Sequence, residues 1–304
     1  MPTNGKPVAM TPSLFRSLAA DPFWNLAVEA WLLQQLPADT ARLFLYVNAP
    51  TVVLGCNQNP WRESDPARLA RHNIHLARRA SGGGAVYHDP GNLNVSLLVP
   101  RSRHQPAVLE ALLTDALADL GLAAAANPRH GLECGGRKVS GGAFQLTRDA
   151  ALHHATLLVA TDLAALQAAL QPAGVAARTT GQAVASVRAT VANLAAFRPG
   201  LTPADAAEAI IRRWTGGPAG DAEPLAPGRP WPPPDELEAR RAEFASWEWR
   251  FGRTPDFTVH DWQPEAGRPP LTVRVHQGRI TAPPPLSDSV PPPPADWLGQ
   301  PFPA

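Results

Sequence analysis

The stretch RRASGGGAVYHDPGN, residues 78–92, is the most informative part of this chain. Three consecutive glycines allow the backbone to approach a ligand closely and to point several N–H groups at an anion. Arg78 and Arg79 place positive charge at the edge of the loop, which suits a phosphate or a carboxylate. The spacing is neither that of a Walker loop nor that of a GxGxxG dinucleotide fingerprint. A plain glycine-rich hairpin is the alternative, but the double arginine and the following His88-Asp89 favour a binding loop.

A second glycine-rich stretch, GGRKVSGG at residues 135–142, contains one of only two lysines in the chain, Lys6 and Lys138. The chain has 25 arginines, so lysine has been replaced almost everywhere else. Lysine is a compact point charge on a flexible stem, whereas arginine is a planar fork. A lysine flanked by glycines is suited to a phosphate or acyl-phosphate oxygen. A surface lysine on a turn is the alternative interpretation.

Composition divides the chain of 304 residues into two parts. Hydrophobic residues make up 44%, enough for a core, and the net charge of +1 argues against nucleic acid or an anionic membrane as partner. Of the 35 prolines, 20 lie between Pro218 and Pro303. We therefore expect a folded domain over 11–245, with a Pro/Gly-rich linker at 215–235 inside it, and a separate C-terminal segment with a Pro-rich tail over 246–304.

Hydrophobic periodicity and turn residues predict an α+β fold: a mixed or antiparallel β-sheet with flanking helices, plus a short C-terminal accessory segment. The predicted helices cover 25–36, 107–120, 163–170, 203–214 and 235–247. The predicted strands cover 43–47, 51–54, 85–87, 94–99, 138–144 and 154–160, with a hairpin of 272–275 and 279–281 around Gln277-Gly278. The proline runs from Pro283 onward predict an extended, partly disordered tail.

Paired histidines, His153 and His154, precede the apolar run ATLL. Adjacent residues of a strand point to opposite faces, so at most one of them faces a given site. A zinc site is not predicted, since no third or fourth ligand has suitable spacing, and Cys56 and Cys134 have no metal or redox spacing. The absence of a GxSxG sequence argues against a Ser-His-Asp hydrolase.

These motifs occur in an order that resembles the lipoate–protein ligase family, which includes lipoyltransferases and is more distantly related to biotin–protein ligases. The resemblance covers Asp21 to about Phe257. The matching segments are DPFWNLAVE (21–29), NQNPW (57–61), RRASGGGAVYHD (78–89), GRKVSG (136–141), HHATLL (153–158), SVR (186–188), VANL (191–194), WEW (247–249) and FG (251–252).

The resemblance implies a two-step reaction: Mg-ATP activates lipoate to lipoyl-AMP, and the lipoyl group then passes to one lysine of a lipoyl domain. It implies Lys138 as the catalytic residue at the carboxyl–phosphate junction, where a cation would neutralise developing charge. The implied ATP-binding residues are Arg79, Gly82, Gly83, Gly84, Ala85, Val86, Tyr87, His88, Asn92 and Lys138. The implied substrate-binding residues are Asn25, Glu29, Arg78, Ser140, Gly141 and His154, and no protein metal ligand is predicted.

Three departures from the family pattern bear on this interpretation. The family commonly has an aspartate shortly before the lysine motif, and the matching position here is Gly131. Losing that carboxylate would weaken Mg²⁺ binding or the positioning of Lys138. Gly142 stands where the family often has serine, and Ala155 where it often has glycine. Only about 55 residues follow the WEW segment, so the accessory domain is short.

The main prediction is a lipoate–protein ligase, and the alternative is a lipoyltransferase that uses preformed lipoyl-AMP or a lipoylated protein. A biotin ligase is less favoured, because its usual arginine-glycine loop is replaced here by RRASGGG. A non-catalytic lipoate binder or sensor is the fourth hypothesis. The implied partners are lipoyl domains of 2-oxoacid dehydrogenase E2 subunits and the glycine-cleavage H protein, with no nucleic acid, no membrane and a monomeric enzyme. The lack of a signal or transit pattern predicts a cytoplasmic location.

Overall fold

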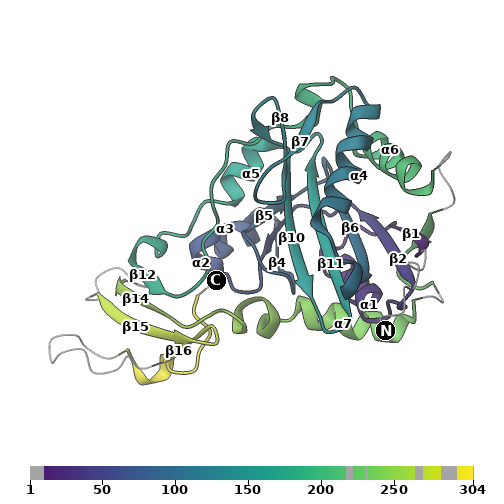
Figure 1. Ribbon diagram of the computed structural model, residues 1–304. Helices are drawn as coiled ribbons and strands as arrows, with labels where there is room; N and C mark the ends of the chain where they lie inside the picture. The colour runs from purple at the N-terminus through teal and green to yellow at the C-terminus, as the bar shows by residue number, and fades with distance from the viewer. Residues whose placement is uncertain (1–9, 217–221, 230–231, 264–269, 282–292, 304) are drawn as a thin grey trace, which may run out of the picture. The chain divides into compact units, whose positions relative to one another are not determined.

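The computed structural model describes residues 10–303 except 217–221, 230–231, 264–269 and 282–292 (Figure 1). The chain forms two compact units that are interleaved along the sequence. The first unit consists of Met1–Ala49, His88–Asp162 and Ala189–Arg241, and the second of Pro50–Tyr87, Leu163–Arg188 and Ala242–Ala304. The predicted division near residue 245 stays a prediction, since these units follow packing and not family domain limits.

A mixed sheet forms the centre of the first unit, as the α+β prediction requires. Among the described residues it has six strands in the order β10-β11-β6-β2-β1-β13. Their bounds are β1 Thr11–Ser17, β2 Thr40–Tyr46, β6 Asn92–Pro100, β10 Ser140–Leu146, β11 Ala150–Leu158 and β13 Glu223–Leu225. The pairs from β10 to β2 are antiparallel, whereas β1 pairs in parallel with both β2 and β13.

The two faces of this sheet are covered by different helices (Figure 1). Helices α4 (Pro106–Asp119) and α6 (Pro203–Thr215) pack on the face that carries Leu43 and Leu45 of β2. Helix α1 (Pro22–Gln34) and Leu237 of α7 (Pro234–Ala245) pack on the face that carries Phe44. This arrangement follows from alternation, because successive residues of a strand point to opposite faces.

Helix α1 begins three residues before the predicted start. The Asp21 side chain caps it by accepting hydrogen bonds from Phe23 N at 2.8 Å and Trp24 N at 3.2 Å, and Pro22 occupies the first turn. The helix is buried on nearly all sides, because Arg241 of α7 also reaches Asp21 (2.6 Å) and α7 covers its outer face. Asn25 and Glu29 are therefore held inside the unit instead of facing solvent.

A small antiparallel sheet precedes β10. It contains β7 (Ala124–Ala126), β8 (Leu132–Cys134) and β9 (Arg137–Lys138). The predicted strand 138–144 is thus two strands, separated at Val139.

The second unit has its own core around Trp61. One sheet has the order β4-β3-β5, and the other is antiparallel with the order β12-β14-β15-β16. The strand bounds are β3 Thr51–Leu54, β4 His75–Arg78, β5 Val86–His88, β12 Thr179–Gly181, β14 Phe257–Trp262, β15 Leu271–His276 and β16 Arg279–Thr281. The helices are α2 Pro60–Glu63, α3 Pro66–Arg71 and α5 Leu163–Ala169, with a π-helical turn at Glu248–Gly252. The predicted hairpin around Gln277-Gly278 is confirmed, with both residues at positive φ.

Two segments that the sequence predicted to be poor in regular structure are partly ordered. The linker at 215–235 contains β13, which forms the edge of the main sheet beside β1, where proline can be tolerated. The end of the tail is ordered: Phe302 is buried in the second core, and Trp61 Nε1 donates to Pro303 O at 2.6 Å. Residues 282–292 of the predicted disordered tail lie outside the described residues.

Candidate functional site

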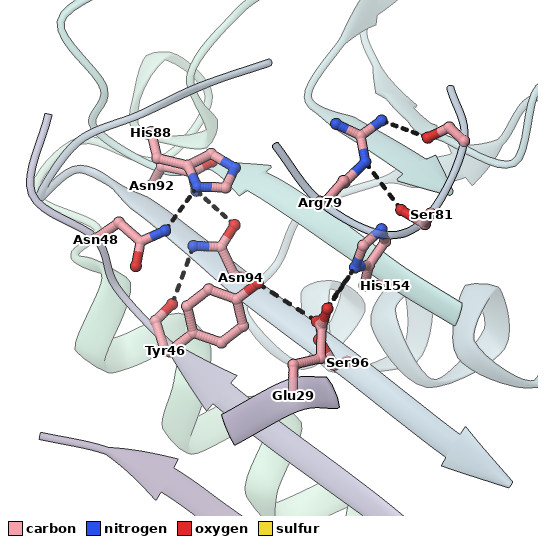
Figure 2. Close-up of polar contacts among 11 residues, drawn as sticks. Glu29, Tyr46, Asn48, Arg79, Ser81, His88, Asn92, Asn94, Ser96 and His154 are labelled. Carbon is pink, nitrogen blue, oxygen red and sulfur yellow. Dashed lines mark hydrogen bonds and ion pairs between the residues drawn. The ribbon is translucent and has the colours of Figure 1, made fainter. Parts of the chain in front are cut away.

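The glycine-rich loop after β4 is braced by its two arginines. Arg79 Nε donates to Ser81 Oγ at 2.9 Å (Figure 2). Its terminal nitrogens donate to the carbonyl oxygens of Val53, Gly82 and Gly84. Arg78 is 1% exposed and donates to Arg250 O (2.9 Å), Gln58 O (2.8 Å) and Thr254 Oγ1 (3.0 Å). Burial lowers the pKa of Arg78 to about 10, so it is still charged at neutral pH. Both side chains therefore fix the backbone of the loop.

Small residues are required here because the backbone segments approach each other closely. A Cβ atom on Gly55 would lie 2.2 Å from Gly83 O, and one on Gly84 would lie 2.9 Å from Ser186 Oγ. Gly83 also has a φ of 88°, a conformation that disfavours a side chain. Within the described chain, the amides of Gly82, Gly83 and Gly84 form no hydrogen bond. Backbone N–H groups without a protein acceptor are candidates for binding an anion.

Ser186 holds the end of this loop. Its hydroxyl accepts from Ala85 N (2.8 Å) and from Gln58 Nε2 (3.0 Å), while its own amide donates to Glu63 Oε1 (3.1 Å). Gln58 Oε1 in turn accepts from Gly55 N at 2.9 Å. The sequence pattern did not select Ser186 or Gln58 as site residues, because neither stands beside the glycines in the chain.

Lys138 follows a tight turn of two glycines. Gly135 and Gly136 both have positive φ, which is the geometry of a two-residue hairpin joining β8 to β9. The backbone of Lys138 is held on its other side by Thr190 O (3.0 Å) and by Ala192 N (2.9 Å). The turn therefore fixes where the lysine stem begins.

The ammonium of Lys138 has no ion-pair partner within 4.0 Å among the described residues. Burial lowers its pKa, Arg129 lowers it further, and Glu133 raises it. A Cβ atom on Gly141 would lie 3.5 Å from Lys138 Nζ, so Gly141 lies beside the lysine, and its role in substrate binding stays a prediction. Ser140 is buried, and its hydroxyl has no hydrogen-bond partner in the described structure.

Glu29 and His154 meet on the α1 face of the sheet (Figure 2). Glu29 Oε1 accepts from Ser96 Oγ at 2.5 Å, lies 3.1 Å from His154 Nδ1, and lies 3.4 Å from the Tyr46 hydroxyl. The side chains of Glu29 and His154 are 5% and 11% exposed. A buried carboxylate held by three donors is a fixed polar anchor in an otherwise apolar layer.

The same face carries the predicted residues His88 and Asn92 (Figure 2), and Asn25 joins them through Asn48. Asn25 Nδ2 donates to Asn48 Oδ1 at 2.8 Å, and Asn48 Nδ2 lies 3.0 Å from His88 Nδ1. Asn92 Nδ2 donates to Asn94 Oδ1 at 3.1 Å. All of these side chains are buried, so the first unit contains a continuous polar stripe inside its core.

The sequence reasoning missed Asn48, Asn94 and Ser96 in this polar stripe. A signal was present: Asn92, Asn94 and Ser96 are polar at every second position of a strand whose other residues are apolar. That alternation predicts one polar face. His153 confirms the expected opposition of the two histidines, because it lies against Phe144 with ring centroids 4.2 Å apart, away from Glu29.

The described residues offer few side-chain ligands for a metal ion. Among the residues that the structure describes, no group of three or more His, Cys, Asp or Glu side chains is arranged to hold a metal ion. Mg²⁺ in nucleotide sites commonly uses one or two carboxylates together with phosphate oxygens. Within the described part of the chain, no helix has the length and apolar character needed to cross a bilayer.

Comparison with known proteins agrees with this architecture. Residues 21–215 match the family model of the lipoyl protein ligase A/B catalytic domain. LipL1 of P. falciparum in complex with lipoate is similar in structure, with a TM-score of 0.69 and 23% identity over 89% of this chain and 83% of that chain. A bipartite lipoate protein ligase of T. acidophilum, studied with its E2 lipoyl domain, gives 0.62 and 24% over 79% and 96%. A lipoate–protein ligase A bound with ATP gives 0.60 and 23% over 80% and 98%.

Proposed function

Because this chain belongs to the lipoyl protein ligase A/B catalytic-domain family, we propose that it is a lipoate–protein ligase. In the proposed reaction, a lipoate carboxylate oxygen attacks the α-phosphorus of ATP and pyrophosphate leaves. The ε-amine of an acceptor lysine then attacks the acyl carbon, an amide forms, and AMP leaves. The observation that carries this proposal is Lys138, a partly buried cation without an ion-pair partner among the described residues, fixed by a glycine turn.

The first step joins two anions, so it needs positive charge where they meet. Lys138 is suited to this task, because it forms no salt bridge with any described residue and is partly removed from water. An electrostatic donor of this kind typically contributes a factor of about 10²–10³ in rate. No covalent enzyme intermediate is required, since the adenylate itself carries the activated acyl group.

The glycine-rich loop supplies the features that a nucleotide phosphate requires. The amides of Gly82, Gly83 and Gly84 are the proposed anion-binding groups, and Arg79 and Ser186 form hydrogen bonds with the backbone of the same loop. ATP and Mg²⁺ are therefore the proposed cofactors, with the metal carried on the phosphates. Direct contact of Arg78 or Arg79 with a ligand stays a prediction; in this structure their nitrogens donate to the protein.

The buried polar stripe on the α1 face supplies fixed groups for the acyl substrate. Glu29, His154 and Asn25 are held by hydrogen bonds inside an apolar layer, which is typical of sites that orient a mostly apolar ligand. Ser140 and Gly141, next to Lys138, are proposed to face the carboxyl end. Lipoyl domains of 2-oxoacid dehydrogenase E2 subunits and the H protein are the proposed acceptors; the T. acidophilum ligase was studied with its E2 lipoyl domain.

Intact-mass analysis of a lipoyl domain tests this function in two parallel reactions. One contains lipoate and Mg-ATP, and the other contains synthetic lipoyl-AMP. A ligase modifies the domain in both, and Lys138→Ala loses the first reaction while Lys6→Ala, at the only other lysine, keeps it. Modification with lipoyl-AMP alone would reduce the protein to a transferase, and no modification in either tube would reject the proposal.

A further inference from the structure

Position 131 has no room for a side chain. A Cβ atom on Gly131 would lie 2.5 Å from Ser140 O, a distance at which the backbone would have to move. The carbonyl of Gly131 accepts from Asn127 N at 2.8 Å, so the segment is also held from the other side. The aspartate expected before the lysine motif therefore cannot be restored here by a single substitution without displacing β10.

A carboxylate is present two residues later. Glu133 is the middle residue of β8, whose flanking Leu132 and Cys134 point into the core. Residues i and i+2 of a strand share a face, so Glu133 lies on the face that Gly131 begins. In the antiparallel pairing with β9, Glu133 is directly opposite Lys138. Side chains opposite each other in such a pair are neighbours.

The Glu133 carboxylate is held in place by Asn127. Asn127 Oδ1 accepts from Arg129 N (3.0 Å) and from Gly131 N (3.1 Å), which fixes the orientation of the amide. Asn127 Nδ2 then donates to Glu133 Oε1 at 3.0 Å. The carboxylate is thus presented by a built arrangement and not by a freely moving surface side chain.

Two charged groups act on Lys138 in opposite directions. Arg129 lowers the pKa of Lys138 and Glu133 raises it, against the lowering by burial. Strand β10 and residues 189–192, which also contact the lysine segment, carry no ionisable side chain. Glu133 is therefore the acidic group that opposes both burial and Arg129.

We propose that Glu133 is a positioning residue that places a carboxylate opposite Lys138, in place of an acidic residue at position 131. This proposal rests on the lipoate–protein ligase function for its catalytic meaning. Its electrostatic content is independent of that function, because the charge on Lys138 can be measured without any substrate.

Amine labelling measures that charge directly. A short pulse of isotopic acetic anhydride modifies only the unprotonated amine, and Lys138 is one of just two lysines, so peptide mass spectrometry follows it without ambiguity. Glu133→Gln removes the carboxylate charge at nearly constant volume. The pKa of Lys138 should fall further, so its labelling rate at pH 7–8 should rise by about threefold or more. Arg129→Gln should change the rate in the opposite direction.

Matched controls separate this effect from general loosening. Glu208→Gln removes an exposed glutamate that pairs with Arg16 at 3.9 Å, and it should leave Lys138 labelling unchanged. Glu133→Asp keeps the charge and should label like wild type. Equal labelling profiles for wild type and Glu133→Gln would overturn the proposal, as would an aspartate variant that labels like the glutamine variant. Glu133→Thr, which favours a strand, replaces the glutamine variant if that one does not fold.

The activity arm distinguishes the two proposals. In the ligase assay, Glu133→Gln should move the alkaline limb of the kcat profile to lower pH by about half a unit or more, the shift that a threefold change in labelling represents, with little change in KM. An inactive wild type would reject the ligase function while the labelling result would still stand. An active wild type with an equally active glutamine variant and the same alkaline limb would reject the role of Glu133.

Discussion

The two glycine-rich turns of this protein differ in which group is held by hydrogen bonds and which group is left available for binding. In the loop at 80–85, the arginines are buried and donate to backbone carbonyls, and the amides of Gly82, Gly83 and Gly84 make no hydrogen bond among the described residues. In the turn at 135–138, the backbone holds the side chain, and the lysine is the group that is left available. Arginine suits the first task because its fork donates to several carbonyls at once, and lysine suits the second because it is a compact charge. A glycine-rich composition therefore predicts a turn, but it does not predict whether the backbone or a side chain of that turn binds the ligand.

The largest effect should come from Lys138. Lys138→Ala removes the charge at the proposed junction of the two anions, and kcat/KM for pyrophosphate release should fall about 10³-fold, or about 4 kcal/mol. Lys138→Arg should not recover more than a few per cent, since the planar fork cannot occupy the same position. A pyrophosphate-release assay with Lys6→Ala as control measures this. An arginine variant with more than about a third of wild-type activity would contradict the division of tasks between the two turns.

Replacing Arg78 should lower the stability of the protein and not act directly on the chemical step. Arg78→Ala leaves the carbonyls of Arg250, Gly55 and Gln58 without their donor inside the second unit, and the free energy of unfolding should fall by about 3–5 kcal/mol. Urea denaturation measures the loss. The matched control is Arg137→Ala in the other turn, where the arginine is exposed and stacks on Phe197 with its guanidinium carbon 4.9 Å from the ring centroid. That variant should lose less than about 1 kcal/mol.

His153 is a second buried basic side chain, and it differs from Arg78 in having no hydrogen-bond partner among the described residues. Arg78 keeps its charge because carbonyl oxygens surround it, whereas both ring nitrogens of His153 lack partners in the described structure. Burial, with the nearby histidines, lowers the pKa of His153 to about 3. The unfolded chain then binds one more proton between pH 6.5 and 3, so stability is lost as pH falls through that range.

This linkage predicts a pH dependence of the free energy of unfolding that should be absent when His153 is replaced. Wild type should lose about 1.4 kcal/mol per pH unit more than His153→Phe below pH 6, or about 2 kcal/mol at pH 5. Urea melts at pH 7, 6 and 5 provide the comparison, with an activity check at pH 7 to confirm that the phenylalanine variant is folded. Parallel pH dependences for the two proteins would show that His153 can be protonated in the folded state.

The smallest effect should come from Ser186. Ser186→Ala removes the acceptor for Ala85 N and Gln58 Nε2, which loosens the glycine loop but leaves its glycines in place. The expected cost is about 1 kcal/mol in stability and a rise in the KM for ATP of up to about tenfold, with kcat nearly unchanged. Steady-state kinetics at varied ATP separate the two constants. Ser13→Ala, whose hydroxyl makes one 3.5 Å contact with Ala41 O, is the control and should change neither.

Local sequence patterns predicted the helices and strands of this fold better than they predicted which strands pair. The helices at 22–34 and 203–215 and the hairpin at 271–281 were predictable because caps, periodicity and a Gln-Gly turn are local signals. The sheets that β5 and β6 join were not predictable, since β5 lies in the β4-β3-β5 sheet and β6 in the six-stranded sheet. The turn between them depends on Gly91, where a Cβ would lie 2.2 Å from Ala160 O, and this contact joins residues far apart in the chain.

The candidate site shows the same limit. Lys138, Gly141, Glu29 and His154 were found from motifs, and the structure brings them into two pairs. Ser186 and Asn48 act through hydrogen bonds to residues that are distant in sequence, so no spacing rule could select them. Gly131 was identified as a departure, but its reason, the approach of Ser140 O, needed coordinates.

The burial of Phe302 has a consequence for how this protein is made. Trp61 packs edge-to-face against Phe302, with centroids 5.2 Å apart, and bonds to a residue 242 positions later. Translation at about 5–20 residues per second separates the synthesis of these partners by roughly 10–50 s. During that interval the apolar strands β3 and β4 exist without their final covering. The second unit should therefore be the part of the nascent chain that depends most on molecular chaperones.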